Sequence, residues 1–80
     1  MKEGLLALVS AAMEAKNLGE TLGTLGYDET PYFNIFSNIA DGICKLLGES
    51  DVPFEETRTS EALHTPDLTL AQRVKILLGE

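Results

Sequence analysis

The single histidine of the chain, His64, lies three residues after Glu61, and this spacing is its nearest approach to a metal motif. In di-iron helical bundles, a Glu-x-x-His pair on one helix directs a carboxylate and an imidazole to a shared site. Such sites need two of these pairs and further carboxylates. We therefore interpret Glu61 and His64 as a surface pair and expect no metal. A metal site would remain possible only in a dimer that brings the Glu61 and His64 pairs of two copies together.

Two side chains have nucleophilic chemistry. Ser60 lies four residues before His64, so both share a helix face, but no residue marks the orienting acid or oxyanion site that nucleophilic catalysis needs. Cys44 lies among apolar residues, whereas a catalytic thiol normally occupies an electropositive site. We interpret Cys44 as a small core residue. The sequence therefore predicts a protein that is not an enzyme and that needs no cofactor.

Charge and length narrow the class of protein further. The 80 residues predict one domain, over residues 1–80, with a small hydrophobic core. The formal charge of −7 disfavours nucleic acid and anionic membranes, because cationic patches supply most of the affinity for both. A lone cysteine excludes an internal disulfide and suits a reducing compartment, so we expect a cytoplasmic protein.

The stretch from Thr30 to Gly48 predicts a central helix. We expect Thr30 as its N-cap, Pro31 at the first helical position, and Gly48 in a left-handed conformation after its last residue. Its apolar residues form two adjacent stripes: Phe33, Phe36, Ala40, Ile43 and Leu47, and Tyr32, Ile35, Ile39 and Leu46. Because this apolar surface is wider than one partner helix covers, the helix should contact at least two others.

A long first helix is predicted from Lys2 to Leu25, antiparallel to the central one. Its apolar residues recur in heptad steps and form a candidate dimer seam: Leu8, Ala11, Ala15, Leu18 and Leu22, followed by Leu25. Gly19 and Gly23 interrupt it, so either the helix frays after Leu18 or these glycines let another backbone approach closely. We expect it to continue and to end in a Schellman turn at Gly26, and we interpret the apolar N-terminus as helix rather than signal peptide.

The last third predicts two short helices. A weak one extends from Phe54 to His64 with few apolar residues, and a second follows Thr69, whose hydroxyl forms a capping box with Gln72. On the second we expect Leu70, Val74, Leu77 and Leu78 to face the core and Arg73 to face away. The sequence thus predicts an all-α fold, a small three- to four-helix bundle. An acidic first half argues against a DNA-binding helix-turn-helix in this region.

Aromatic residues gather around the turn between the first two helices, where Tyr27, Tyr32 and Phe33 form a candidate protein-contact surface. The competing interpretation is that these rings close one end of the bundle. Substituting Tyr27 or Tyr32 separates the two, because loss of folding favours closure and loss of association favours contact.

Two functions are compatible with these features. The first is a non-enzymatic protein-protein interaction domain that self-associates, most simply as a homodimer through the first two helices, or binds another protein. The alternative is an acidic inhibitor, a nucleic-acid mimic that occupies a cationic surface of another protein in a salt-sensitive manner.

Overall fold

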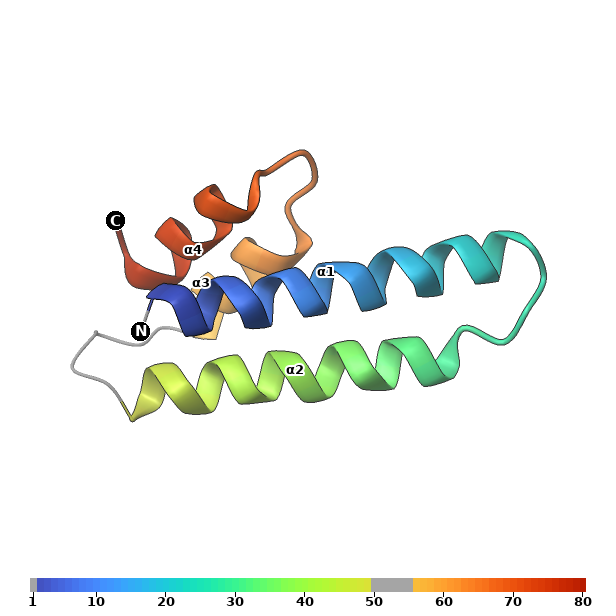
Figure 1. Ribbon diagram of the computed structural model, residues 1–80, viewed down its shortest axis with the longest axis horizontal. Coiled ribbons are helices and arrows are strands. Elements are labelled where there is room, and N and C mark those ends of the chain that lie inside the picture. The colour runs from blue at the N-terminus through green and yellow to red at the C-terminus, as the bar shows by residue number, and fades with distance from the viewer. Residues whose placement is uncertain (1, 50–55) are drawn as a thin grey trace.

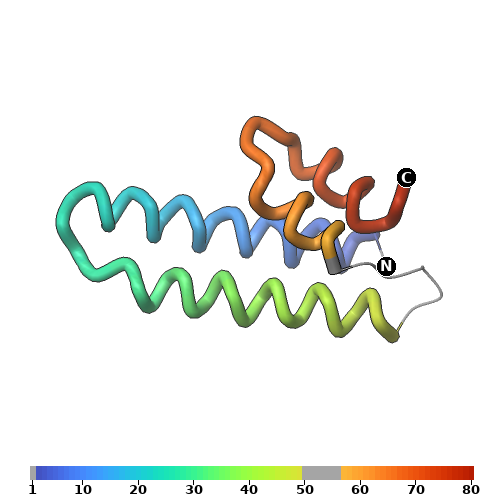
Figure 2. Tube along the Cα trace, turned by 180° about the vertical axis from the view of Figure 1, so that it is seen from behind, coloured from blue at the N-terminus to red at the C-terminus, as the bar shows by residue number. Residues whose placement is uncertain are grey.

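The computed structural model describes residues 2–49 and 56–80 and contains four helices in these ranges, which confirms the all-α fold (Figure 1). They are α1 (Lys2–Thr24), α2 (Thr30–Gly48), α3 (Glu56–His64) and α4 (Leu70–Leu78). The helices α1 and α2 form a long antiparallel hairpin. Figure 2 shows α3 and α4 packed on the half of this hairpin that holds the start of α1 and the end of α2.

The hydrophobic core lies in that same half of the hairpin. Its buried residues are Leu5, Val9, Ala12 and Ala15 of α1, Phe36, Ile43 and Leu47 of α2, Ala62 and Leu63 of α3, and Val74 and Leu77 of α4. Residues 17–35, which we call the tip, contribute nothing to this core and extend past α3 and α4 (Figure 1). The predicted contact of the central helix with two others is confirmed, since α2 packs against α1 and α3.

The turn between α1 and α2 closes as the sequence predicts. Gly26 has φ +87°, its N–H bonds the Gly23 carbonyl at 3.1 Å, and the Tyr27 N–H bonds the Leu22 carbonyl at 2.9 Å. These two bonds are the Schellman pattern, and they require a residue that tolerates a left-handed backbone. The helix α1 ends at Thr24, one residue before its predicted end.

The glycines inside α1 mark a close approach of α2, and the helix continues through both. A Cβ added at Gly19 would lie 3.3 Å from the Phe33 ring and 3.3 Å from the Tyr32 Cβ. The Glu29 side chain lies against Gly23 in the same way. The helix does not fray after Leu18, but the close neighbours are side chains from the start of α2 and the residue before it, where the second predicted explanation expected another backbone.

Both predicted caps of α2 are wrong by one residue. The helix begins at Thr30 itself, and the Asp28 side chain accepts a hydrogen bond from the Thr30 N–H at 3.0 Å. At the other end Gly48 is helical, and Glu49 follows it with φ −92°, so its N–H bonds the Lys45 carbonyl without a left-handed residue. The predicted start of the third helix at Phe54 lies outside the described residues.

The short helix α3 is held at its C-terminus by two cations from neighbouring helices. The Arg73 guanidinium donates hydrogen bonds to the carbonyls of Ala62, at 2.8 Å, and Thr65, at 3.0 Å. The Lys16 ammonium donates to the Leu63 carbonyl at 3.3 Å. Positive charge at this end complements the helix dipole and the free carbonyls. The prediction that Arg73 faces away is therefore wrong, and its side chain is buried.

The capping box of α4 is confirmed. The Thr69 hydroxyl accepts a hydrogen bond from the Gln72 N–H at 3.1 Å, and the Gln72 side chain accepts one from the Thr69 N–H at 2.8 Å. Gly79 closes the helix with φ +74°. Val74 and Leu77 are buried as predicted, but Leu70 at the start of the helix is 37% exposed.

Candidate interaction surface

The residues with metal or catalytic potential do not converge on one site. Glu61 and His64 are both exposed, and the His64 ring lies against Phe36 with a centroid separation of 5.5 Å. Among the residues that the structure describes, no group of three histidine, cysteine or acidic side chains is close enough to hold a metal ion. The pair Glu61 and His64 thus lies at the surface, where the sequence places it.

Cys44 contacts α3 instead of a cavity. Its half-buried thiol lies 3.5 Å from the hydroxyl of Thr59, a threonine that is itself buried. This contact joins the end of α2 to the start of α3 through a weak sulfur hydrogen bond. The structure places Cys44 at a helix-helix contact.

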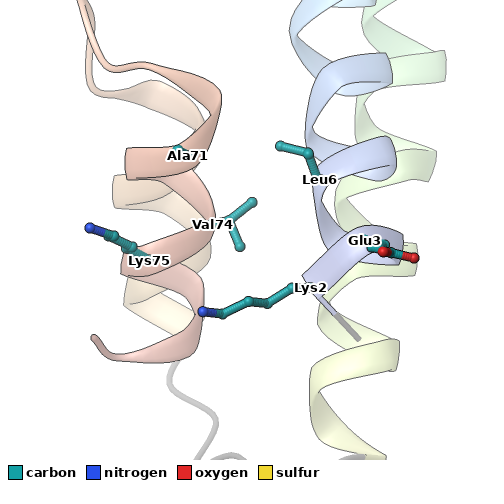
Figure 3. Close-up of a pocket in the computed structure, with 6 residues that line it drawn as sticks. All are labelled: Lys2, Glu3, Leu6, Ala71, Val74 and Lys75. Atoms are coloured by element: carbon teal, nitrogen blue, oxygen red, sulfur yellow. The ribbon is translucent and has the colours of Figure 1, made fainter.

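A shallow hollow of about 220 Å³ separates the start of α1 from α4 (Figure 3). Leu6, Ala71 and Val74 give it an apolar wall, while Glu3 and Lys75 point away from it. The Lys2 ammonium crosses its mouth, and it forms a 3.5 Å ion pair with Glu80. Since these polar groups do not point at a common position, the hollow resembles a seam between two helices more than a ligand site.

The three aromatic residues predicted as a contact surface have unequal exposure. Tyr27 is 68% exposed, whereas Tyr32 and Phe33 are half-buried. Phe33 packs on Gly19, so its ring helps to close the hairpin. Beside them, Asp28 is held by the Thr30 hydrogen bonds, from the backbone N–H first and the side chain second, and these lower the pKa of its carboxyl. A contact role remains a prediction for these residues, most directly for Tyr27.

The predicted dimer seam lies beside the core stripe of α1. Ala15 is its one buried member, Leu8 and Leu22 are half-buried, Ala11 is exposed, and Leu18 is 45% exposed. Each residue turns the helix by about 100°, which places this seam roughly 100° around α1 from the core residues Leu5, Val9 and Ala12. It therefore follows a second apolar side of the same helix.

An apolar side of α2 continues the seam. Lys16 on α1 and Cys44 on α2 mark the side of the hairpin that α3 occupies, because both contact it. Each residue advances by about 100° around its helix axis, so positions can be counted from Lys16 on α1 and from Cys44 on α2. On α1 this count places the seam, and on α2 it places residues 35, 39, 42 and 46, on the side of the hairpin opposite to α3. In Figure 1 no helix lies in front of this side, and Figure 2, the view from behind, shows α3 in front of the hairpin, on the side opposite to it.

We call this surface the open face. It comprises Leu8, Ala11, Ala15, Leu18 and Leu22 of α1 and Ile35, Ile39, Gly42 and Leu46 of α2. None of these residues is charged. Ile35 is 48% exposed, and Leu18 at the margin also borders a hollow against Leu70. Sequence reasoning found the α1 half of this surface from its heptad steps, and found the α2 half as a second apolar stripe.

Acidic side chains are spread over the molecule. Those within the described ranges are exposed and lie on α1 (Glu3, Glu14, Glu20), in the first turn (Asp28, Glu29), on α2 (Asp41), and further along at Glu49, Glu61, Asp67 and Glu80. A nucleic-acid mimic would present them as a continuous ridge. Among the acidic side chains that the structure describes, these positions alone do not define one acidic surface, and the acidic-inhibitor hypothesis stays a prediction from the net charge.

Fold and surface together define an all-α domain with one covered and one uncovered apolar side of a helical hairpin. Comparison of the chain with protein-family models, with curated proteins and with solved structures found no match. Within residues 2–49 and 56–80, no helix has the length and hydropathy to cross a membrane.

Proposed function

We propose that this protein is a non-enzymatic protein-protein interaction domain and that the open face is its binding surface. The observation that carries the proposal is the uncharged apolar side of the two longest helices, which no other described helix covers. Water-exposed apolar surface of this extent is characteristic of a binding site for another apolar surface. Among the described residues, by contrast, Ser60, His64 and Cys44 have no convergent set of catalytic partners around them.

The size of the open face suits a specific interface. A helix of 23 residues, such as α1, is roughly 35 Å long, and two packed helices are about 20 Å wide. This side of the hairpin, margins included, therefore measures on the order of 700 Å² in projection. A specific protein interface buries about 800 Å² on each partner, so the side is large enough to form one.

Burial of this face would supply a favourable free energy. Leu18 is 45% exposed to solvent and Ile35 is 48% exposed. Full burial of such a side chain contributes about 1.5–3 kcal/mol. Covering the exposed half of each should therefore contribute roughly 1 kcal/mol. The open face itself carries no charged residue that would have to be desolvated, although Glu14 lies beside Leu18 at its margin.

Site-specific photo-crosslinking tests the proposal whatever the identity of the partner. A photoreactive phenylalanine analogue replaces Leu18 on the open face or, as the matched control, Asn38 on the exposed polar side of α2. Illumination in the host cell should give a discrete protein adduct from position 18, to a second copy or to another protein, and none from position 38. Equal adducts from both positions, or none from either, would contradict the proposal.

A further inference from the structure

We infer that the occupant of the open face is a second copy of this chain, packed with its hairpin antiparallel so that each tip covers the opposite end of its partner. This inference rests on the proposed function and adds to it the identity and the orientation of the partner. The starting observation is that large and small side chains are separated along the open face.

Large exposed side chains lie at the tip. Leu18 and Ile35 are about half exposed, and Leu25 just beyond the seam is 66% exposed. The opposite half of the same side carries small exposed residues, namely Gly4, Ala7, Ala11 and Gly42. A Cβ added at Gly4 or Gly42 would meet nothing within 4 Å, so space is open above both positions. Leu8 and Leu46, the large residues of that half, are half-buried against the core, so this half protrudes less than the tip.

A surface with this gradient is complementary to itself in one orientation. The two-fold axis of this dimer lies in the interface, perpendicular to the helix axes, and passes near Ala15 and Ile39. Around this axis, α1 of one copy packs antiparallel on α1 of the other. Leu18 and Leu25 of one copy then lie against the segment from Gly4 to Ala11 of the other. Small residues also let helix backbones approach closely, as dense packing of the interface requires.

The same axis places Ile35 near Gly42 of the second copy. The parallel arrangement instead sets leucines of α1 against Ile35 and Tyr32 at the crowded tips and leaves the glycine and alanine ends apart. Packing to interior density excludes such an arrangement of protrusions against protrusions. An isologous antiparallel dimer also closes on itself, so association stops at two copies.

Charge is compatible with a second copy. A net charge of −7 on each chain would oppose association if acidic side chains met in the interface. The open face carries none, and antiparallel packing keeps α3 and α4 on the outer sides of the dimer. The two acidic turns around Asp28 and Glu29 then lie at opposite ends, whereas parallel packing would bring them together.

Dipolar distance measurement between spin labels tests both the partner and its orientation. The full chain carries one label at Tyr27→Cys, with Cys44→Ser keeping a hydroxyl next to Thr59. Position 27 is twelve residues from the two-fold axis at Ala15, and each residue of helix adds about 1.5 Å. In the antiparallel dimer the two labels therefore lie on opposite sides of the axis and are roughly 35 Å apart. A dominant distance of this length supports the inference.

Other outcomes separate the inference from the proposed function. A distance below about 20 Å, as expected from packed neighbouring helices, means parallel packing and overturns the orientation while self-association stands. No dipolar coupling at high concentration means that the second copy is not the occupant. An adduct between Leu18 and another protein would then retain the proposed function alone.

A charge on the open face gives the matched control. Leu18→Glu should abolish the coupling and raise the dimer dissociation constant at least tenfold, because a carboxylate would be buried against Ala11 of the second copy. Asn38→Glu adds the same charge on the polar side and should leave the coupling unchanged. Circular dichroism verifies that both variants keep their helix content. Equal effects of the two variants would overturn the inference.

Discussion

Replacing Arg73 by methionine should destabilise the whole domain although the residue lies near the C-terminus. The guanidinium is 8% exposed and forms two hydrogen bonds, to the Ala62 and Thr65 carbonyls. Methionine keeps much of the apolar stem, so the change removes the charged donors and leaves little cavity. The Ala62 carbonyl then loses its partner in a buried position, and the Thr65 carbonyl loses its partner in a partly buried one.

The expected loss follows from those two bonds. A hydrogen bond involving a charged group contributes about 1.5–3 kcal/mol, and removing the buried guanidinium also removes its desolvation cost. The net decrease in the free energy of unfolding should therefore be about 2–3 kcal/mol. In a domain of this size, 1 kcal/mol corresponds to roughly 4–8 °C in Tm, so the melting temperature should fall by about 10–20 °C.

Urea and thermal unfolding followed by circular dichroism at 222 nm measure this loss. The control is Lys75→Met, which makes the same change of charge on an exposed position of α4 and should shift stability by less than about 0.5 kcal/mol. All samples are compared at one protein concentration, since self-association would otherwise shift the midpoints. An Arg73 variant as stable as the Lys75 variant would refute the role of the guanidinium in holding α3.

Three further substitutions or titrations probe other parts of the hairpin. Gly42→Ala should raise the free energy of unfolding of the single chain by about 0.5–1 kcal/mol in urea melts at concentrations too low for association, since an open helical position gains from a Cβ, and no gain would contradict this. Gly19→Val should instead lower it by about 1–3 kcal/mol by displacing Phe33, and an unchanged melting midpoint would contradict the close contact. The Asp28 carboxyl should titrate below 3.8 by NMR, so its stabilising contribution is present above pH 3.8 and lost as the pH falls through the folded pKa; a midpoint at or above 3.8 would contradict the hydrogen bonds to Thr30.

The sequence was most informative where local chemistry decides the structure. The Schellman turn at Gly26 and the capping box of Thr69 with Gln72 are confirmed because each depends on a few neighbouring residues. At the start of α2 the prediction was misplaced because Asp28 accepts a hydrogen bond from the Thr30 N–H, so Thr30 is already helical, and at its end Gly48 stays helical and Glu49 follows without a left-handed residue. Alternative local caps of this kind differ by one residue and by little energy.

Tertiary contacts decided what the sequence left open. The helix α1 is apolar on two sides, and periodicity gives no reason to prefer the stripe at Leu5, Val9 and Ala12 over the seam at Leu8 and Leu18. Packing against α2 and α3 selects the first. Arg73 was placed on the outside because a charged residue is seldom buried alone, and the carbonyls that satisfy it belong to another helix.

The absence of core residues from the tip has a consequence for local unfolding. Amide hydrogens between residues 17 and 35 are protected by the α1–α2 contact alone, so they should open at a lower free energy than those of the core. A molecule bound over Leu18 and Ile35 must first hold this segment in its helical form. Recognition and the local folding equilibrium are thereby linked: part of the binding free energy orders the tip, and hydrogen exchange there reports how much of the face is occupied.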